Sequence, residues 1–283
     1  MKVFEKAYVI ILKENIPSKD ERIKEMLSVL DIPWEYHYAF NGEKELSDED
    51  IKNYTLGPGA RRGSSERVPM KKGEYGCVRS HVDVAKRARD ENLSGYLVLE
   101  EDTLISPDFR ERLVTIEKEM PEDTDMIFPG VNYLGPRLNP GSDRHTTRML
   151  PPIKHRKTEH LWDFSTIKHF GTFAILIKAQ SYDKIIELWE HYDNIADLQV
   201  YNAGRREELK ILNLVPTCTY KKDGQSFINN RTRDYHNTRS LYSPSPDIEN
   251  AIGIRKLIKE GKIIKNKYEV HWNGNWSQQK GLF

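Results

Sequence analysis

The feature that most constrains the fold is the alternation of short apolar runs with helical patterns. The run "AYVIIL" at 7–12 has the length of a buried strand, and apolar residues at helical spacing follow it over 20–30. The run "GYLVL" at 95–99 follows a longer helical pattern over 74–92. Strands that alternate with helices build βαβ units around a mostly buried sheet. The sequence therefore predicts an α/β domain.

Other segments continue or interrupt this alternation. Further strand patterns lie at 34–40, 125–128, 172–177 and 209–215, and further helical patterns follow residue 108 and begin at residue 182. Two stretches, 55–72 and 132–171, are rich in glycine or proline and have little periodicity, so we expect loops there. The second stretch carries a basic run from Arg137 to Lys157 that would suit an anionic ligand.

Three consecutive acids, Glu100, Glu101 and Asp102, stand directly after the run at 95–99. Adjacent like charges are unfavourable unless a cation or solvent screens them. In open α/β sheets ligands bind beyond the carboxyl ends of strands, and hard cations such as Mg²⁺ take carboxylate oxygens as ligands. Two interpretations remain open: a metal site, or a solvated turn whose acids favour the start of the next helix.

Composition excludes several classes of function. A formal charge of +1 with 31% charged residues argues against a dedicated nucleic-acid binder. Cys77 and Cys218 lie far apart and in no C-x-x-C pattern, so cysteine spacing indicates neither a disulfide framework nor a zinc site. No apolar run approaches the length of a membrane span. We expect a cytoplasmic protein, and no motif indicates its oligomeric state.

The block "GEYGCVRSH" at 73–81, followed by "LVLEED" and "SPDF", resembles the signature of glycosyltransferase family 25, the lipopolysaccharide-biosynthesis type. Arg22 and "AFNGE" at 39–43 are similar to earlier positions of that family, and "GTFAILIKAQ" is similar to a later one. The text "SFI" closes the resemblance at residue 228. We therefore predict a catalytic domain at 1–228 and a C-terminal extension at 229–283 packed on the same domain.

The resemblance implies a GT-A-like fold, a Rossmann-like mixed sheet flanked by helices. It implies a nucleotide-diphosphate sugar as donor, with a UDP-sugar expected, and Mn²⁺ or Mg²⁺ as cofactor. The sugar would pass to a hydroxyl of a glycan acceptor with inversion, and the enzyme could lie against a membrane that carries the acceptor. Asp102 and Glu100 would be the metal ligands, and Asp197 the catalytic base.

Further donor contacts are expected from Glu100 and from five other residues, three of which also have an ordinary structural interpretation. Arg22 could hold the pyrophosphate or lie on a solvated helix face. Glu74 could instead stabilise a helix N-terminus, and His81 could contact donor or acceptor or be a hydrogen-bonded packing residue on a helix. Ser80 belongs to the same block, and Glu101 is the central acid of the three.

The chain departs from the family pattern at three positions. Glu101 replaces the usual central aspartate, Asn41 replaces the aspartate of "AxDG", and Arg79 stands where small or apolar residues are usual.

Two functions of other classes are alternatives to a glycosyltransferase. One is an inactive nucleotide-sugar-binding or interaction module, favoured by Glu101 and by Trp272 and Trp276 in the tail. The other is a metal-dependent phosphoesterase, which usually needs more acids and histidines than the sequence places together.

Overall fold

The computed structural model describes most of the first two thirds of the chain and short strands beyond it. The described residues are 3–58, 65–105, 108–130, 132–133, 156–163, 165, 169–214, 218–221, 224–226, 231–233, 263–265 and 270–272.

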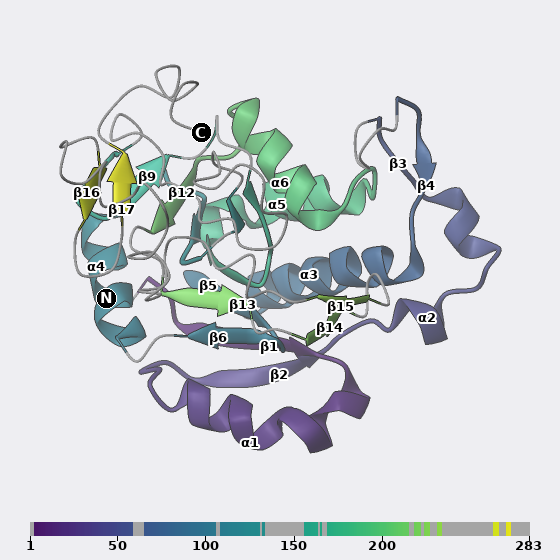
Figure 1. Cartoon of the computed structure of the whole chain (residues 1–283), viewed down its shortest axis with the longest axis horizontal. Coiled ribbons are helices and arrows are strands. Elements are labelled where there is room, and N and C mark those ends of the chain that lie inside the picture. The colour runs from purple at the N-terminus through teal and green to yellow at the C-terminus, as the bar shows by residue number, and fades with distance from the viewer. Residues whose placement is uncertain are drawn as a thin grey trace.

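A seven-stranded mixed sheet forms the centre of the fold (Figure 1). Its order is β2-β1-β5-β11-β7-β12-β9. The pairs β1–β2, β1–β5 and β7–β12 are parallel, whereas β11 runs antiparallel to both β5 and β7. The predicted mixed sheet is therefore confirmed. The strands span Trp34–Tyr38 (β2), Lys6–Ile11 (β1), Gly95–Glu100 (β5), Ala174–Lys178 (β11), Met126–Phe128 (β7), Ile211–Leu214 (β12) and Leu161–Asp163 (β9).

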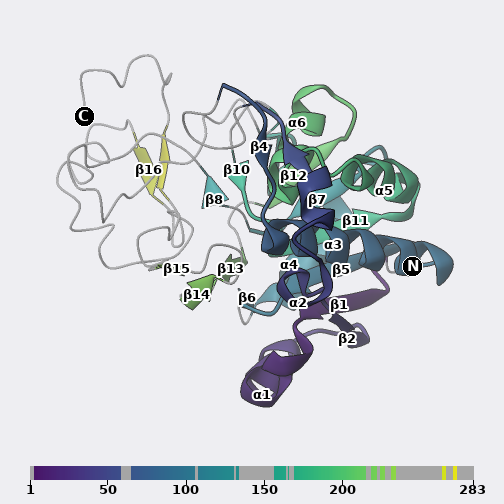
Figure 2. The same ribbon diagram turned by 90° about the vertical axis from the view of Figure 1, so that its right-hand side faces the viewer.

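Helices cover both faces of this sheet. α3 (Lys72–Asp90), α5 (Tyr182–Glu190) and α6 (Ala196–Arg205) bury apolar residues against one face. α1 (Ile16–Leu27) and α4 (Phe109–Glu119) do so against the other. Figure 2 shows α1 and α6 at opposite ends of the molecule. The predicted helices flanking the sheet are therefore present.

Burial on both faces explains why the strand sequences are continuously apolar rather than alternating. In β1, Tyr8 and Ile10 pack with the core on the α3 side, and Val9 and Ile11 pack with the core on the α1 side. Successive side chains of a strand point to opposite faces, so each residue of the run meets a different helix layer.

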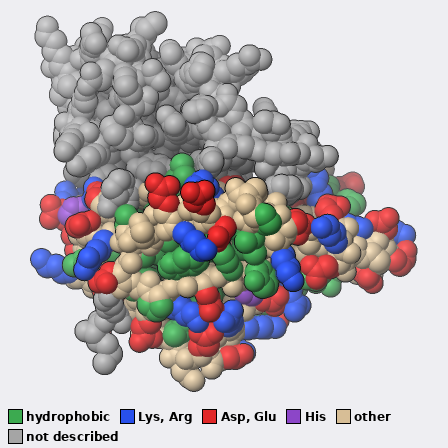
Figure 3. Space-filling model, turned by 90° about the horizontal axis from the view of Figure 1, so that it is seen from below, with side chains coloured by type: hydrophobic (Ala, Val, Ile, Leu, Met, Phe, Trp, Pro, Cys, Tyr) green, Lys and Arg blue, Asp and Glu red, His purple; other side chains and the backbone are tan. Residues whose placement is uncertain are grey.

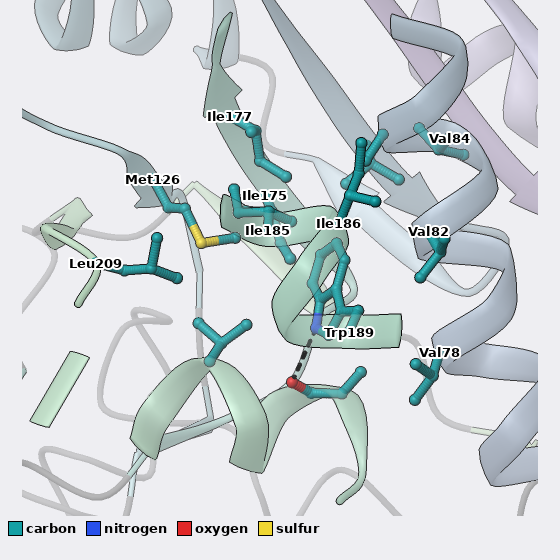
Figure 4. Packing of buried hydrophobic residues seen from close by; sticks show 14 of the residues in the cluster. Val78, Val82, Val84, Met126, Ile175, Ile177, Ile185, Ile186, Trp189 and Leu209 are labelled. Carbon is teal, nitrogen blue, oxygen red and sulfur yellow. Dashed lines mark hydrogen bonds between the residues drawn. The ribbon is translucent and has the colours of Figure 1, made fainter. Parts of the chain in front are cut away.

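The core between α3 and α5 is centred on Trp189, which is fully buried (Figure 4). Val78 and Val82 of α3 face it, and Ile185 and Ile186 lie one turn before it on α5. The indole Nε1 donates a hydrogen bond to the carbonyl oxygen of Ala196 at 3.4 Å, at the start of α6. A large aromatic residue with a polar tip thus joins three helices at one point.

The structure corrects the expectation that 55–72 and 132–171 are loops without regular structure. β3 (Thr55–Leu56) and β4 (Val68–Pro69) pair within the first stretch. In the second, β9 closes the edge of the main sheet, and β8 (Asn132–Tyr133) pairs with β10 (His169–Phe170). These strands are too short for their periodicity to show in the sequence. Most of the basic run from Arg137 lies outside the described residues.

Short strands continue the chain beyond the sheet. β6 (Thr103–Ile105) follows the three acids and pairs with β13 (Thr219–Lys221), and β14 (Gly224–Ser226) pairs with β15 (Arg231–Arg233). The β14–β15 pair joins both sides of the predicted boundary between residues 228 and 229. The remaining short elements are α2 (Gly42–Glu45), β16 (Ile263–Lys265) and β17 (Val270–Trp272), of which the last two pair with each other.

Two surface properties bear on the expected partners. Within the described part of the chain, no helix has both the length and the apolar character of a membrane span. On the face seen in Figure 3, acidic and basic side chains are interspersed around a hydrophobic area.

We predict that Val82→Ala lowers the free energy of unfolding by about 2 kcal/mol, because it removes two buried methyl groups and leaves a cavity. Val82 is fully buried on α3, whereas Val114 on α4 is 62% exposed. Val114→Ala is the matched control and is expected to change the free energy by less than about 0.5 kcal/mol. Urea unfolding of both variants measures the difference, and equal effects would contradict this packing.

Candidate functional site

A cavity of about 280 Å³ opens at the edge of the sheet where β1, β2 and β5 end. These strands are parallel, so their carboxyl ends meet at one edge. Leu12 follows β1, Ala39 and Phe40 follow β2, and the acids 100–102 end β5 and follow it. The first half of α3 supplies another part of the wall, and residues around the start of α1 and around α2 complete it. The three acids therefore lie at the edge where the sequence predicts a ligand.

Two residues of the block at 73–81 fix the wall of this cavity. A Cβ atom on Gly76 would lie 2.6 Å from the carbonyl oxygen of Phe40, so only glycine permits this approach. One turn later, Ser80 Oγ accepts a hydrogen bond from the backbone nitrogen of Phe40 at 3.0 Å and donates one to the Gly76 carbonyl at 2.7 Å. Ser80 lines the cavity, but these bonds give its hydroxyl a structural role.

Glu100 and His81 face each other across the cavity wall. Glu100 Oε1 accepts a hydrogen bond from the Thr172 hydroxyl at 2.8 Å, and His81 Nε2 lies 3.5 Å from the same oxygen. His81 is only 1% exposed, and its ring centroid lies 5.2 Å from that of Trp189. Packing against the core therefore sets the position of the imidazole, and both side chains reach the cavity.

Glu101 is turned away from its two neighbours toward the start of α1. Its Oε1 accepts hydrogen bonds from Asn15 Nδ2 and Lys19 Nζ, both at 2.7 Å, and its Oε2 accepts one from the backbone nitrogen of Leu12 at 3.3 Å. The Lys19 ammonium balances the charge of the central acid. The additional methylene of glutamate, compared with aspartate, lengthens the side chain that spans to α1.

Arg22 and Glu74 make backbone contacts outside the cavity lining. The Arg22 guanidinium donates to the carbonyl oxygens of Glu101 and Thr103, so it fastens the acidic turn to α1. Glu74 is buried in the first turn of α3, and its Oε2 accepts a hydrogen bond from the Lys71 nitrogen at 2.9 Å. These contacts favour the structural interpretation of both residues.

Asp102 and Asp197 occupy different places. Asp102 is half-buried and lines the cavity beside Glu100. Asp197 lies in the first turn of α6 and is not part of the lining; its Oδ2 accepts a hydrogen bond from the Gly171 nitrogen at 3.2 Å. The next residue, Thr172, donates to Glu100. One short segment therefore contacts both carboxylates.

Hydrogen bonds at the rim of the cavity explain why asparagine is suitable at position 41. Glu14 Oε1 accepts hydrogen bonds from Asn41 Nδ2 and Lys44 Nζ, both at 2.8 Å. The hydrogen bond from Lys44 lowers the pKa of the Glu14 carboxyl group below its usual value. An aspartate at position 41 would place a second carboxylate against Glu14, whereas the amide of Asn41 donates to it.

Sequence reasoning missed several residues of the site. Lys19 and Thr172 carry no local signal, because their partners Glu101 and Glu100 lie far away in the sequence. The spacing of the two cysteines gives no sign that Cys77 lines the site, although Cys77 stands four residues before His81 and therefore on the same helix face. Arg79 pairs with Asp83 at 3.0 Å and is not part of the cavity lining.

The chain matches glycosyltransferase family 25 (LPS biosynthesis protein) over residues 4–199. Procollagen galactosyltransferase 2 of Mus musculus and that of Homo sapiens are each 28% identical to it over 132 residues. That match covers 45% of this chain and 21% of each relative.

Two solved structures are distantly similar to this chain. A glycosyltransferase involved in glycosylation of the major capsid of PBCV-1 is 11% identical, with a TM-score of 0.34 and 66% of each chain covered. Mouse xyloside xylosyltransferase 1 is 12% identical, with a TM-score of 0.32, covering 96% of this chain and 84% of that one. Likenesses at this level carry no information on function.

The family match covers more than two thirds of the chain and includes the block at 73–81 and the three acids. The chain therefore belongs to glycosyltransferase family 25, and the predicted family is confirmed. Membership of a family of glycosyltransferases, together with the mixed sheet, agrees with the predicted GT-A-like fold.

We predict that Glu101→Gln lowers the free energy of unfolding by about 1–2 kcal/mol, because it removes the charge that Lys19 and Asn15 stabilise. Glu43→Gln is the matched control, since Glu43 is an exposed residue on the rim of the same cavity. Urea unfolding compares the two variants. Equal stabilities would show that the contacts of Glu101 with α1 contribute nothing measurable.

Proposed function

We propose that the protein is a metal-dependent glycosyltransferase. It transfers a sugar from a nucleotide-diphosphate donor, a UDP-sugar, to a hydroxyl of a glycan or glycoconjugate acceptor with inversion. The observation that carries this proposal is the position of the family's acidic motif: Glu100 and Asp102 line a cavity at the carboxyl edge of the sheet in a chain of glycosyltransferase family 25.

The residues present fit a hard divalent cation. All three consecutive acids line the cavity: Glu101 is engaged with Lys19, and Glu100 and Asp102 are its neighbours in the sequence. Carboxylate oxygens are the ligands that Mg²⁺ and Mn²⁺ prefer, and one or two of them together with substrate phosphates form typical sites. When bound, such a cation neutralises charge on the departing diphosphate.

The chain itself orients the reacting groups. Leu12 and Phe40 form an apolar part of the wall, which limits the access of water to the donor. The Thr172 hydroxyl holds the Glu100 carboxylate by a hydrogen bond, and His81 lies beside that carboxylate. We propose Asp197 as the base that takes the proton of the acceptor hydroxyl as that oxygen attacks the anomeric carbon. Its contact with Gly171 supports this role, because the same segment positions Glu100.

The relatives suggest the first sugar to test. Both are named procollagen galactosyltransferases, so UDP-galactose is the first donor for a transfer assay. The contacts of Glu101 also bear on the alternative of an inactive binding module. The carboxylate of Glu101 pairs with Lys19, and Glu100 and Asp102, the two positions expected to hold the metal, line the same cavity. We therefore favour an active enzyme.

We predict that a saturating UDP-sugar stabilises the protein only when Mn²⁺ is present, by about 2.7 kcal/mol at a concentration 100 times the Kd. Asp102→Asn is expected to abolish this stabilisation with the fold intact. Asp123→Asn is the matched control, because Asp123 is exposed and pairs with Lys210 instead. Thermal unfolding with and without metal measures the effect. Metal-dependent stabilisation of Asp102→Asn equal to wild type would remove Asp102 from the site.

For Asp197→Asn we predict donor binding close to that of wild type and a loss of transfer of at least about 100-fold, the range typical of a general base. Initial rates of sugar transfer with UDP-galactose and a panel of glycan acceptors measure it. Normal transfer by this variant would exclude Asp197 as the base. Donor binding without transfer by the wild type, across all nucleotide sugars and acceptors, would favour the binding module.

A further inference from the structure

Three side chains with metal-binding chemistry meet in the wall of the cavity. Cys77 and His81 lie one turn apart on α3, and Glu100 comes from the end of β5. One thiol, one imidazole nitrogen and one carboxylate oxygen all lie within 4.8 Å of one another. All three residues line the cavity. The cluster thus combines a rigid helix face with a strand end, which fixes its geometry.

The hydrogen bonding of His81 supports a ligand at this cluster. The side chain is 1% exposed, and its Nδ1 has no hydrogen-bond partner. Its Nε2 lies 3.5 Å from Glu100 Oε1, which is longer than an ordinary hydrogen bond. Neither ring nitrogen therefore has a strong partner, which is unfavourable for a buried imidazole, and a metal would satisfy whichever nitrogen faces Cys77 and Glu100.

The donor atoms select the class of metal. A thiolate and an imidazole are typical zinc ligands, whereas Mg²⁺ and Mn²⁺ prefer oxygen. Ligand atoms around tetrahedral zinc lie about 3.5 Å apart, given metal–ligand distances of about 2.0–2.3 Å. Side-chain rotations that close the cluster by about 1 Å would reach that geometry.

We propose that Cys77, His81 and Glu100 form a site for zinc or another thiophilic divalent cation, with the fourth position facing the cavity. When the metal binds, the Cys77 S–H bond breaks, the sulfur–metal bond forms and one proton passes to solvent. Cysteine spacing alone does not indicate this site, because its other ligands are a histidine one helical turn away and a glutamate from another element.

The site shares Glu100 with the cation site proposed for sugar transfer. Zinc at Cys77 and His81 would draw on a carboxylate that the hard-cation site also uses, so we expect zinc to weaken the binding of Mn²⁺ or Mg²⁺. This consequence rests on the proposed function, whereas zinc binding itself does not. Cys77 belongs only to the zinc site, and Asp102 belongs only to the hard-cation site. Variants at these two positions therefore distinguish the two sites.

The test uses the full-length, reduced protein and metal ions alone. Wild type with Co²⁺ is expected to show a thiolate-to-cobalt charge-transfer band, and equilibrium dialysis is expected to show one zinc bound. Cys77→Ser is expected to lose the band and to bind zinc at least about 100-fold more weakly, since even outer-shell partners contribute about 10- to 100-fold. Asp102→Asn is the matched control and is expected to keep the band.

A second measurement avoids any folding defect of the variant. In wild type, Cys77 is half-buried and is expected to react with a thiol-alkylating reagent, whereas Cys218 is 1% exposed and is expected to stay unmodified. Zinc is expected to slow alkylation of Cys77 at least about 10-fold. The cluster of Glu119, Glu159 and His160 contains no sulfur, so metal bound there gives neither signal.

Two outcomes would overturn the zinc site. One is the absence of a charge-transfer band in wild type together with unprotected Cys77, and the other is equal zinc affinity of wild type and Cys77→Ser. Either result with normal Mn²⁺-dependent binding of a UDP-sugar rejects the zinc site and leaves the proposed function standing. A cobalt–thiolate band without any nucleotide-sugar binding supports the zinc site and rejects the proposed function.

Discussion

The burial of β1 and β5 on both faces is the constraint on which the site depends. Helix α3 covers one face of these strands and α1 covers the other, so neither strand can shift its register without exposing apolar residues. Because β1, β2 and β5 run parallel, their carboxyl ends are held at one edge. The polar residues that follow them therefore form one cavity, although they come from distant parts of the sequence.

Two of the three consecutive acids, Glu100 and Glu101, have different partners. Glu100 is held by Thr172 and lies beside His81, and Glu101 is balanced by Lys19 and backed by Arg22. Separate partners in opposite directions reduce the repulsion that three adjacent carboxylates would otherwise experience. The acidic turn is thus neither a simple solvated connection nor a set of three equivalent ligands, although all three acids line the cavity.

The block at 73–81 combines structural and chemical roles on one helix. Gly76 and Ser80 face the turn after β2 and fix Phe40 by close backbone approach and hydrogen bonding. Cys77 and His81, each one residue further along, line the cavity near Glu100. Residues four positions apart share one helix face, so Gly76 and Ser80 lie on one face and Cys77 and His81 on an adjacent one. A short motif can therefore both build the wall and supply its reactive atoms. Glu74 stabilises the first turn of the same helix.

The sequence by itself determined the α/β alternation, the family and the position of the acids after a buried strand. Those properties depend on local periodicity and on a contiguous motif, which a single chain displays directly. Only the tertiary structure decided that Glu101 pairs with Lys19, that Arg22 and Glu74 support the backbone, and that β9 closes the sheet. These outcomes depend on partners separated by many residues or on strands of two or three residues. No sequence pattern encodes which side chain meets which, because packing of the whole fold sets those contacts.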